Sequence, residues 1–261
     1  YASANIFYDS LLPDIASEKN VDSVSSLGYG LGYLGGGSLF LLNVIMYLKP
    51  HIFGIPDGAT AIKLSFLSVA IWWLVFTIPL IFFVSEPSDE KSVNLIKSMN
   101  MGWKQLIETF KEIRKMRVVG MFLLAYWFYI DGVDTIINMA VDYGMSLKFP
   151  NESLIVALLI VQFIAFPAAL IYGWMASKVG TKNGIMIGIM AYSIITLLGY
   201  FMTKVVHFYI LAVLIGLFQG GIQALSRSLY TRIIPPSKSA EFFGFYNMFG
   251  KFAAIIGPAL M

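Results

Sequence analysis

Acidic side chains inside an apolar stretch are the sharpest chemical feature of this sequence. Asp131 and Asp134 lie near the middle of the run Val118–Gly144, about one helical turn apart, and Asn138 continues the same stripe. An ionisable side chain is costly inside a bilayer, so it usually serves a solute pathway, a proton relay or an internal ion pair. We expect a cavity-facing coupling or substrate site here. A structural pair that locks two helices together is the alternative.

A buried lysine is expected to complement these acids. Lys251 lies nine residues beyond Phe242, which places it about 13 Å into the last apolar run. An unpaired ammonium at that depth would be costly, so we expect Asp131 or Asp134 to be its acid partner. Two carboxylates close together in low dielectric disfavour double ionisation, so one of them could hold a proton and couple its movement to that of a solute.

Uncharged polar residues recur in the other apolar runs. An amide can bind the ammonium or the carboxylate of a zwitterion, although hydrogen bonding between helices is its commoner use. We therefore include the polar patch near the start of the chain and three glutamines among the substrate candidates: Asn5, Tyr8, Asp9, Gln162, Gln219 and Gln223.

The composition excludes the soluble classes of protein. Of 261 residues, 58% are hydrophobic and only 13% are charged, with a net charge of +3; soluble domains usually carry about 25% charged residues. So few charges could not cover this much apolar surface in water, which argues against a soluble enzyme or a nucleic-acid binder. There is no Cys, and the two His are far apart. We expect no enzyme activity, no metal, no cofactor and no nucleic-acid partner.

The apolar runs predict an all-α membrane protein. A spanning helix needs about 20 mainly apolar residues. Six runs qualify: Ser26–Leu48, Ile62–Val84, Val118–Gly144, Ser153–Met175, Gly184–Thr203 and His207–Ser226. Phe242–Met261 reads as a truncated seventh span and Ala2–Ile15 as the tail of an eighth. We therefore expect an internal fragment of a longer membrane protein.

Loop charges orient these spans. The connections Ser17–Ser25, Ser85–Arg117, Ala176–Asn183 and Arg227–Glu241 together hold thirteen Lys and Arg, and the other set holds three. This bias predicts that the first set is cytoplasmic. Within it, Ser85–Arg117 becomes amphipathic and basic from Leu95 onward. It is expected to form a helix on the inner membrane surface, or one packed against the ends of the spans; a calmodulin-type target is a third reading.

The order of spans resembles the plan of the major facilitator superfamily, two six-helix halves joined by a cytoplasmic linker. Eight of the expected twelve helices would be present, with residues 1–84 as parental spans 4–6, 85–117 as the linker and 118–261 as spans 7–11. The loop Gly173–Lys182 is similar to the superfamily signature Gly-x-x-x-Asp-Arg-x-Gly-Arg-Arg. The matching positions are Gly173, Lys178, Gly180 and Lys182, whereas Ser177 replaces the acid and Thr181 a base.

Glycines add to this resemblance. Gly28, Gly32 and Gly36 are four residues apart, a spacing that lets helix backbones approach closely, and we expect a tight helix contact at Gly32. Gly257-Pro258 lies in the run that would be the equivalent span of the second half. The common role of such glycines is helix packing.

Three segments narrow the resemblance: Tyr1–Ile15, Val24–Gly37 and Phe128–Ile137. They are similar to the vacuolar amino-acid effluxer family linked to autophagy in fungi, which has bacterial members. The resemblance implies a secondary transporter that moves amino acids outward by alternating access, with protons as an open choice of coupling ion. Its membrane would be the bacterial cytoplasmic membrane, or the vacuolar membrane in a fungus. A non-transporting receptor or scaffold and a lipid transporter are the alternatives on this fold.

Overall fold

The computed structural model describes residues 2–84 and 95–260 of the chain. These residues are helical apart from short connections, and none of them forms a strand. The helices are α1 (Ala2–Ser10), α2 (Leu12–Ile15), α3 (Val21–Leu48), η1 (Pro50–Phe53), α4 (Gly58–Phe83), α5 (Leu95–Lys115), α6 (Arg117–Ser146), α7 (Asn151–Val179), α8 (Thr181–Tyr200), α9 (Val205–Ile233), η2 (Pro236–Lys238) and α10 (Ser239–Leu260). The chain divides into two compact units, Tyr1–Leu34 with Gly102–Met261, and Gly35–Met101.

Six of the described helices, α3, α4, α6, α7, α8 and α9, are long and apolar enough to cross a membrane. They coincide with the six runs expected from the sequence and confirm an integral, multi-pass, all-α membrane protein. The run Ala2–Ile15 is instead interrupted, because α1 ends at Ser10 and α2 carries Pro13 in its first turn. The two partial spans, Ala2–Ile15 and Phe242–Met261, stay predictions.

The smaller unit, residues 35–101, contains the second half of α3, all of α4 and the turn between them. The left-handed Gly54, with φ of 67°, ends η1. Asp57 then caps α4 by accepting a hydrogen bond of 2.7 Å from the backbone N–H of Thr60, and this bond lowers the pKa of the Asp57 carboxyl. Within the unit, the hydroxyl of Ser68 donates to Asn43 of α3 at 2.9 Å, which ties α4 to α3.

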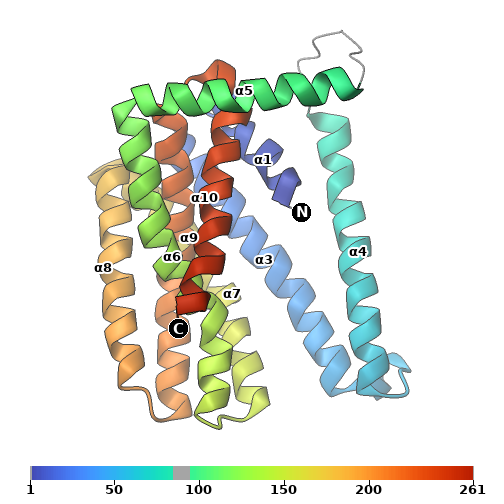
Figure 1. Cartoon of the computed structure of the whole chain (residues 1–261). Coiled ribbons are helices and arrows are strands. Elements are labelled where there is room, and N and C mark those ends of the chain that lie inside the picture. The colour runs from blue at the N-terminus through green and yellow to red at the C-terminus, as the bar shows by residue number, and fades with distance from the viewer. Residues whose placement is uncertain (1, 85–94, 261) are drawn as a thin grey trace. The chain divides into compact units, whose positions relative to one another are not determined.

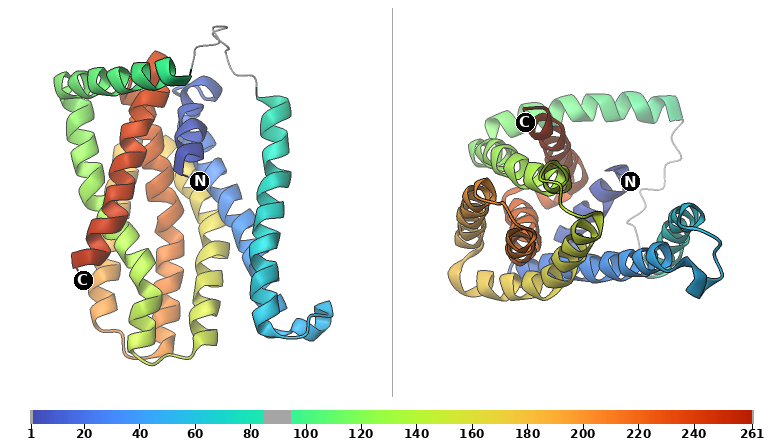
Figure 2. Two further views of the ribbon diagram at one scale, coloured as in Figure 1. Left: turned by 45° about the vertical axis from the view of Figure 1, so that its right-hand side comes forward. Right: turned by 90° about the horizontal axis from the view of Figure 1, so that it is seen from below.

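The larger unit is a bundle of α6 to α10 with the start of the chain. These helices run alongside one another in Figure 1, and α9 packs against both α7 and α8 while α10 packs against α6 and α1. Its α9 carries the most buried face, including Ile222, Leu225 and Tyr230. The view along the helices in Figure 2 shows α9 enclosed among its neighbours. This central helix therefore brings its polar residues to the middle of the unit.

Small residues set the closest approaches of these helices, but Gly32 is not one of them. A Cβ at Gly173 of α7 would lie 2.7 Å from Ser26 of α3, and one at Gly221 of α9 would lie 2.2 Å from the ring of Tyr172. At Gly32 no described atom would come within 4 Å of such a Cβ. The tight helix contact predicted at Gly32 is therefore wrong, because Gly32 opens into a cavity instead.

The predicted amphipathic helix is present as α5; the start of the connection, residues 85–94, lies outside the described residues. The part of α5 in the larger unit runs across the ends of α6 and α10 (Figure 1). Thr109 and Gln105 donate hydrogen bonds to Glu241 of α10. Lys238 is 2.6 Å from Glu112, and this carboxylate raises the pKa of the lysine. These contacts fit a helix packed against the ends of the spans.

That packing leaves an apolar stripe of α5 uncovered. Trp103, Leu106, Ile107 and Phe110 are exposed, whereas Ile113 and Thr109 are buried against the bundle. The stripe is the one that a helix on a membrane surface would turn toward lipid. Both readings of the linker, packing and surface binding, are therefore compatible with one another.

Candidate functional site

A polar cavity of about 600 Å³ lies within the larger unit, lined by α1, α3, α6, α7, α9 and α10. We call it the polar cavity. Eight of the ten predicted substrate or coupling residues line it: Asn5, Tyr8, Asp9, Asp134, Gln162, Gln219, Gln223 and Lys251. Residues from both ends of the chain are thus brought together in one place. Their role in binding stays a prediction.

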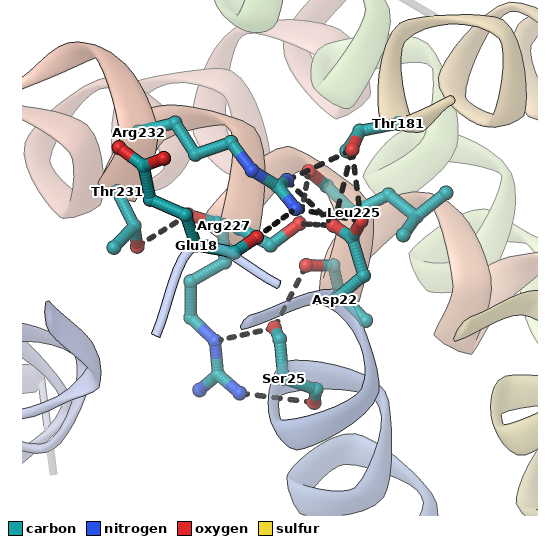
Figure 3. A network of polar contacts seen from close by, with 10 residues as sticks. Glu18, Asp22, Ser25, Thr181, Leu225, Arg227, Thr231 and Arg232 are labelled. Carbon is teal, nitrogen blue, oxygen red and sulfur yellow. Dashed lines mark hydrogen bonds and ion pairs between the residues drawn. The ribbon is translucent and has the colours of Figure 1, made fainter. Parts of the chain in front are cut away.

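An arginine that the sequence analysis assigned to a loop forms one wall of the polar cavity. Arg227 of α9 is only 4% exposed. Its Nη1 donates to Asp9 at 3.0 Å, and its Nε and Nη2 donate to the hydroxyl and the carbonyl of Ser25, each at 3.0 Å. Figure 3 shows the two bonds to Ser25. The guanidinium also lies over the rings of Tyr8 and Tyr29, at 5.4 and 4.7 Å from their centroids.

Asp9 is held on both sides of its carboxylate. One oxygen accepts from Arg227, and the other accepts from the amide of Asn247 of α10 at 3.0 Å. A buried ion pair is stable when such further hydrogen bonds complete it. Asp9 therefore joins α1, α9 and α10. Both of its carboxylate oxygens accept hydrogen bonds from the protein, although Asp9 was expected to face a solute.

A second pair of charges lines the polar cavity from α6 and α10. Asp134 and Lys251 both face it, and the two groups interact electrostatically. Of the two acids proposed as partner of Lys251, the structure thus favours Asp134. Asp131 lines a different pocket, and Asn138 is exposed and lines neither. The three residues share one face of α6, but only Asp134 lines the polar cavity, so the expectation that all three face one cavity is wrong.

The side-chain amides of Gln223 and Gln219 differ in whether their oxygens accept a hydrogen bond from the protein. Gln223 accepts a hydrogen bond of 2.8 Å from the hydroxyl of Tyr33. The side-chain oxygen of Gln219 is buried and has no hydrogen-bond partner among the described residues. An acceptor of this kind in the wall of a cavity can bind a donor on a solute. Four tyrosines complete the wall, namely Tyr29, Tyr33, Tyr126 and Tyr246.

A separate polar network joins the first turn of α3 to α8 and α9 (Figure 3). Arg232 donates to both oxygens of Asp22, at 2.8 and 2.9 Å, and to the hydroxyl of Thr181 at 2.8 Å. Thr181 and Ser228 also donate to Asp22. In the loop Gly173–Lys182, Ser177 stands where the superfamily signature has an acid. Asp22 of α3 places an acid beside that loop, where it accepts a hydrogen bond from Thr181.

The remaining loop positions lie around this network. Gly180 has a φ of 87°, a conformation that favours glycine, and it ends α7. The ammonium of Lys178 lies 3.9 Å from the ring centroid of Trp174, and Lys182 is exposed. Neither lysine takes part in the network around Asp22. Gly173 fits a packing role, Gly180 fits a conformational role at the end of α7, and the two lysines fit a solvated face.

Comparison with known proteins gives the family. The model of the family described as vacuole effluxer Atg22 like matches residues 9–261. YxiO of Bacillus subtilis, described as an uncharacterized MFS-type transporter, is 42% identical over 263 residues, which cover 100% of this chain and 61% of YxiO. Autophagy-related protein 22 of Yarrowia lipolytica is 29% identical over 91% of this chain and 44% of its own length.

Autophagy-related protein 22 of Saccharomyces cerevisiae is 25% identical over 98% of this chain and 57% of its own length. The chain therefore spans between 44% and 61% of the length of these relatives. The identity to an MFS-type protein over the whole chain shows that the helical bundle is of the major facilitator type. The chain belongs to the Atg22-like vacuole effluxer family.

Proposed function

We propose that the protein is a secondary transporter that moves small zwitterions, amino acids in particular, outward by alternating access through the polar cavity. In this proposal residues 1–84 and 118–261 belong to the two halves of the transporter, and the polar cavity lies where they meet. The descriptions of the matching family and of its relative, a vacuole effluxer and an MFS-type transporter, support transport and its direction. The membrane is the bacterial cytoplasmic membrane, or the vacuolar membrane in a fungus.

The observation that carries the proposal is the pairing of opposite charges across one cavity. Lys251 can bind a carboxylate, and Asp134 can bind an ammonium, while both line the same space of about 600 Å³. That volume lies within the ~300–1,000 Å³ usual for small-molecule sites. The unpartnered oxygen of Gln219 offers a further acceptor for the ammonium. A receptor or scaffold has no need of opposite charges that face one cavity at mid-span.

The direct experiment is transport by the full-length protein in vesicles loaded with labelled neutral amino acids. We expect competition by compounds that carry both an ammonium and a carboxylate. Matched compounds that lack either group, a simple amine or a simple carboxylic acid of the same side chain, should compete at least about tenfold less well, because one of the two charge contacts is lost.

Equal competition by the amine and the zwitterion would contradict the proposal, as would the absence of any movement of amino acids. Movement of phospholipid between leaflets in the same vesicles would instead support the lipid-transporter alternative. An inactive protein that still binds the zwitterion would support the receptor alternative.

A further inference from the structure

The part of α5 that belongs to the larger unit, residues 102–115, lies at the membrane end of the bundle. Only Met116 separates it from α6, which is long and apolar enough to cross a membrane. Figure 1 shows this part of α5 running across the ends of α6 and α10 and not along them. A helix that turns aside where a spanning helix begins lies at the depth of the lipid headgroups.

One side of this segment is bound to the bundle. Gln105 and Thr109 donate hydrogen bonds to Glu241 of α10, and Lys238 pairs with Glu112 at 2.6 Å. These contacts fix the rotation of the helix about its own axis. Its other sides are therefore turned toward whatever lies beside the bundle.

The next side of the helix is an exposed apolar stripe. It comprises Trp103, Leu106, Ile107 and Phe110, which fall within about 100° of the helix circumference. Trp103 is 68% exposed. Tryptophan is enriched at membrane interfaces, where its ring contacts apolar chains while its N–H stays near water. Four large apolar side chains exposed at this depth fit a covering of lipid acyl chains.

A row of lysines borders the stripe on the side away from the bundle contacts. Lys104, Lys111 and Lys115 fall within about 40° of the helix circumference, next to Ile107. All three are exposed, and none of them forms an ion pair with another described residue. Glu108 is the one acid beside them in the described part of α5, so the row keeps a net positive charge. Lysine stems can lie along apolar surface while their ammonium groups reach phosphates.

We propose that this face of α5 binds anionic phospholipids of the adjacent leaflet, with the stripe among the acyl chains and the three lysines on the phosphates. Charge complementarity selects this occupant. Each lysine near an anionic membrane surface strengthens attachment about fivefold, a gain that zwitterionic lipid does not offer. An apolar protein partner would cover the stripe but leave the row of lysines without a counter-charge. The inference concerns the linker alone and is independent of which solute the protein moves.

The test uses the full-length protein in phosphatidylcholine nanodiscs, with a bimane fluorophore on Ile107→Cys as the only reactive cysteine. Phosphatidylglycerol or phosphatidylcholine carrying a doxyl quencher on its acyl chain is then titrated into the nanodiscs, and quenching reports contact with α5. We expect phosphatidylglycerol to reach half-maximal quenching at a mole fraction at least about fivefold lower than phosphatidylcholine does. Raising the salt to about 1 M should weaken this preference, because the Debye length falls to about 3 Å.

A variant of the labelled protein tests the lysines directly. Lys104→Gln, Lys111→Gln and Lys115→Gln together should remove the preference for phosphatidylglycerol, while both lipids still quench the fluorophore through the apolar stripe. Lys178→Gln with Lys182→Gln is the matched control. It removes two exposed basic residues of another loop and should keep the preference.

Equal quenching of the labelled protein by the two lipids would overturn the proposal, and so would a preference that survives in the triple variant. Absence of quenching by either lipid would show that protein covers the stripe, which would overturn it as well. None of these outcomes bears on amino-acid transport, which the vesicle experiment measures separately.

Discussion

Arg227 shows how a single residue can join segments that are distant in the sequence. It donates to Asp9 and to Ser25 from a nearly fully buried position, so α9 is fastened to both α1 and α3. Removing one partner of a buried ion pair leaves the other charge without compensation, which costs more than the pair contributes in net terms. The ion pair therefore holds α1 against α9 in the wall of the polar cavity.

Arg227→Met should lower the free energy of unfolding by about 3–5 kcal/mol, because Asp9 loses its cationic partner in a buried place. Adding Asp9→Asn should recover part of that loss, since the remaining amide carries no charge. Chemical denaturation in detergent of the two single variants and the double variant measures this. Strictly additive losses would show that Asp9 and Arg227 do not stabilise the fold as a pair.

The charged residues at mid-span could be predicted from their depth alone, but Arg227 could not. The apolar run ends at Ser226, and a basic residue next to it reads as a loop residue on the cytoplasmic side. The helix continues to Ile233, because its last turns are buried within the protein and need not be apolar to remain helical. Burial by protein and burial by lipid are not distinguished by hydropathy.

At the scale of helices, the closeness of packing depends on which glycine faces a neighbour. Gly221 of α9 lies against the ring of Tyr172 of α7, whereas Gly32 of α3 faces the polar cavity. Both occur in apolar runs with other small residues nearby, so the sequence alone does not separate them. The rotation of each helix about its axis decides which glycine is a contact, and that rotation follows from neighbours that are distant in the sequence.

Gly221→Ala should destabilise the protein by about 1–3 kcal/mol, because its methyl group would press into the Tyr172 ring. Gly32→Ala is the matched control. It should leave stability unchanged or raise it by up to about 1 kcal/mol, the difference in helix propensity between the two residues. The denaturant midpoints of the two variants, each measured against the wild type, compare their stabilities. A Gly32→Ala loss as large as that of Gly221→Ala would contradict the packing described here.

At the scale of the molecule, two polar clusters hold the start of the chain against the later helices. One is the Arg227 pair in the wall of the polar cavity, and the other is the Asp22 and Arg232 network near the first turn of α3. The number and order of spans could be predicted from apolar length and loop charge. The choice of ion-pair partner could not, since Asp9 and Arg227 are more than two hundred positions apart.

The central claim is that Asp134 and Lys251 bind the two charges of a zwitterion in the polar cavity. The measurement that tests it most directly is binding of a labelled neutral amino acid by the full-length protein carrying Asp134→Asn, Lys251→Met or the control Asp142→Asn. We expect affinity to fall by at least about tenfold in each of the first two variants, because each loses one charge contact, and to stay at the wild-type value in the control. Wild-type affinity in both Asp134→Asn and Lys251→Met would contradict the account.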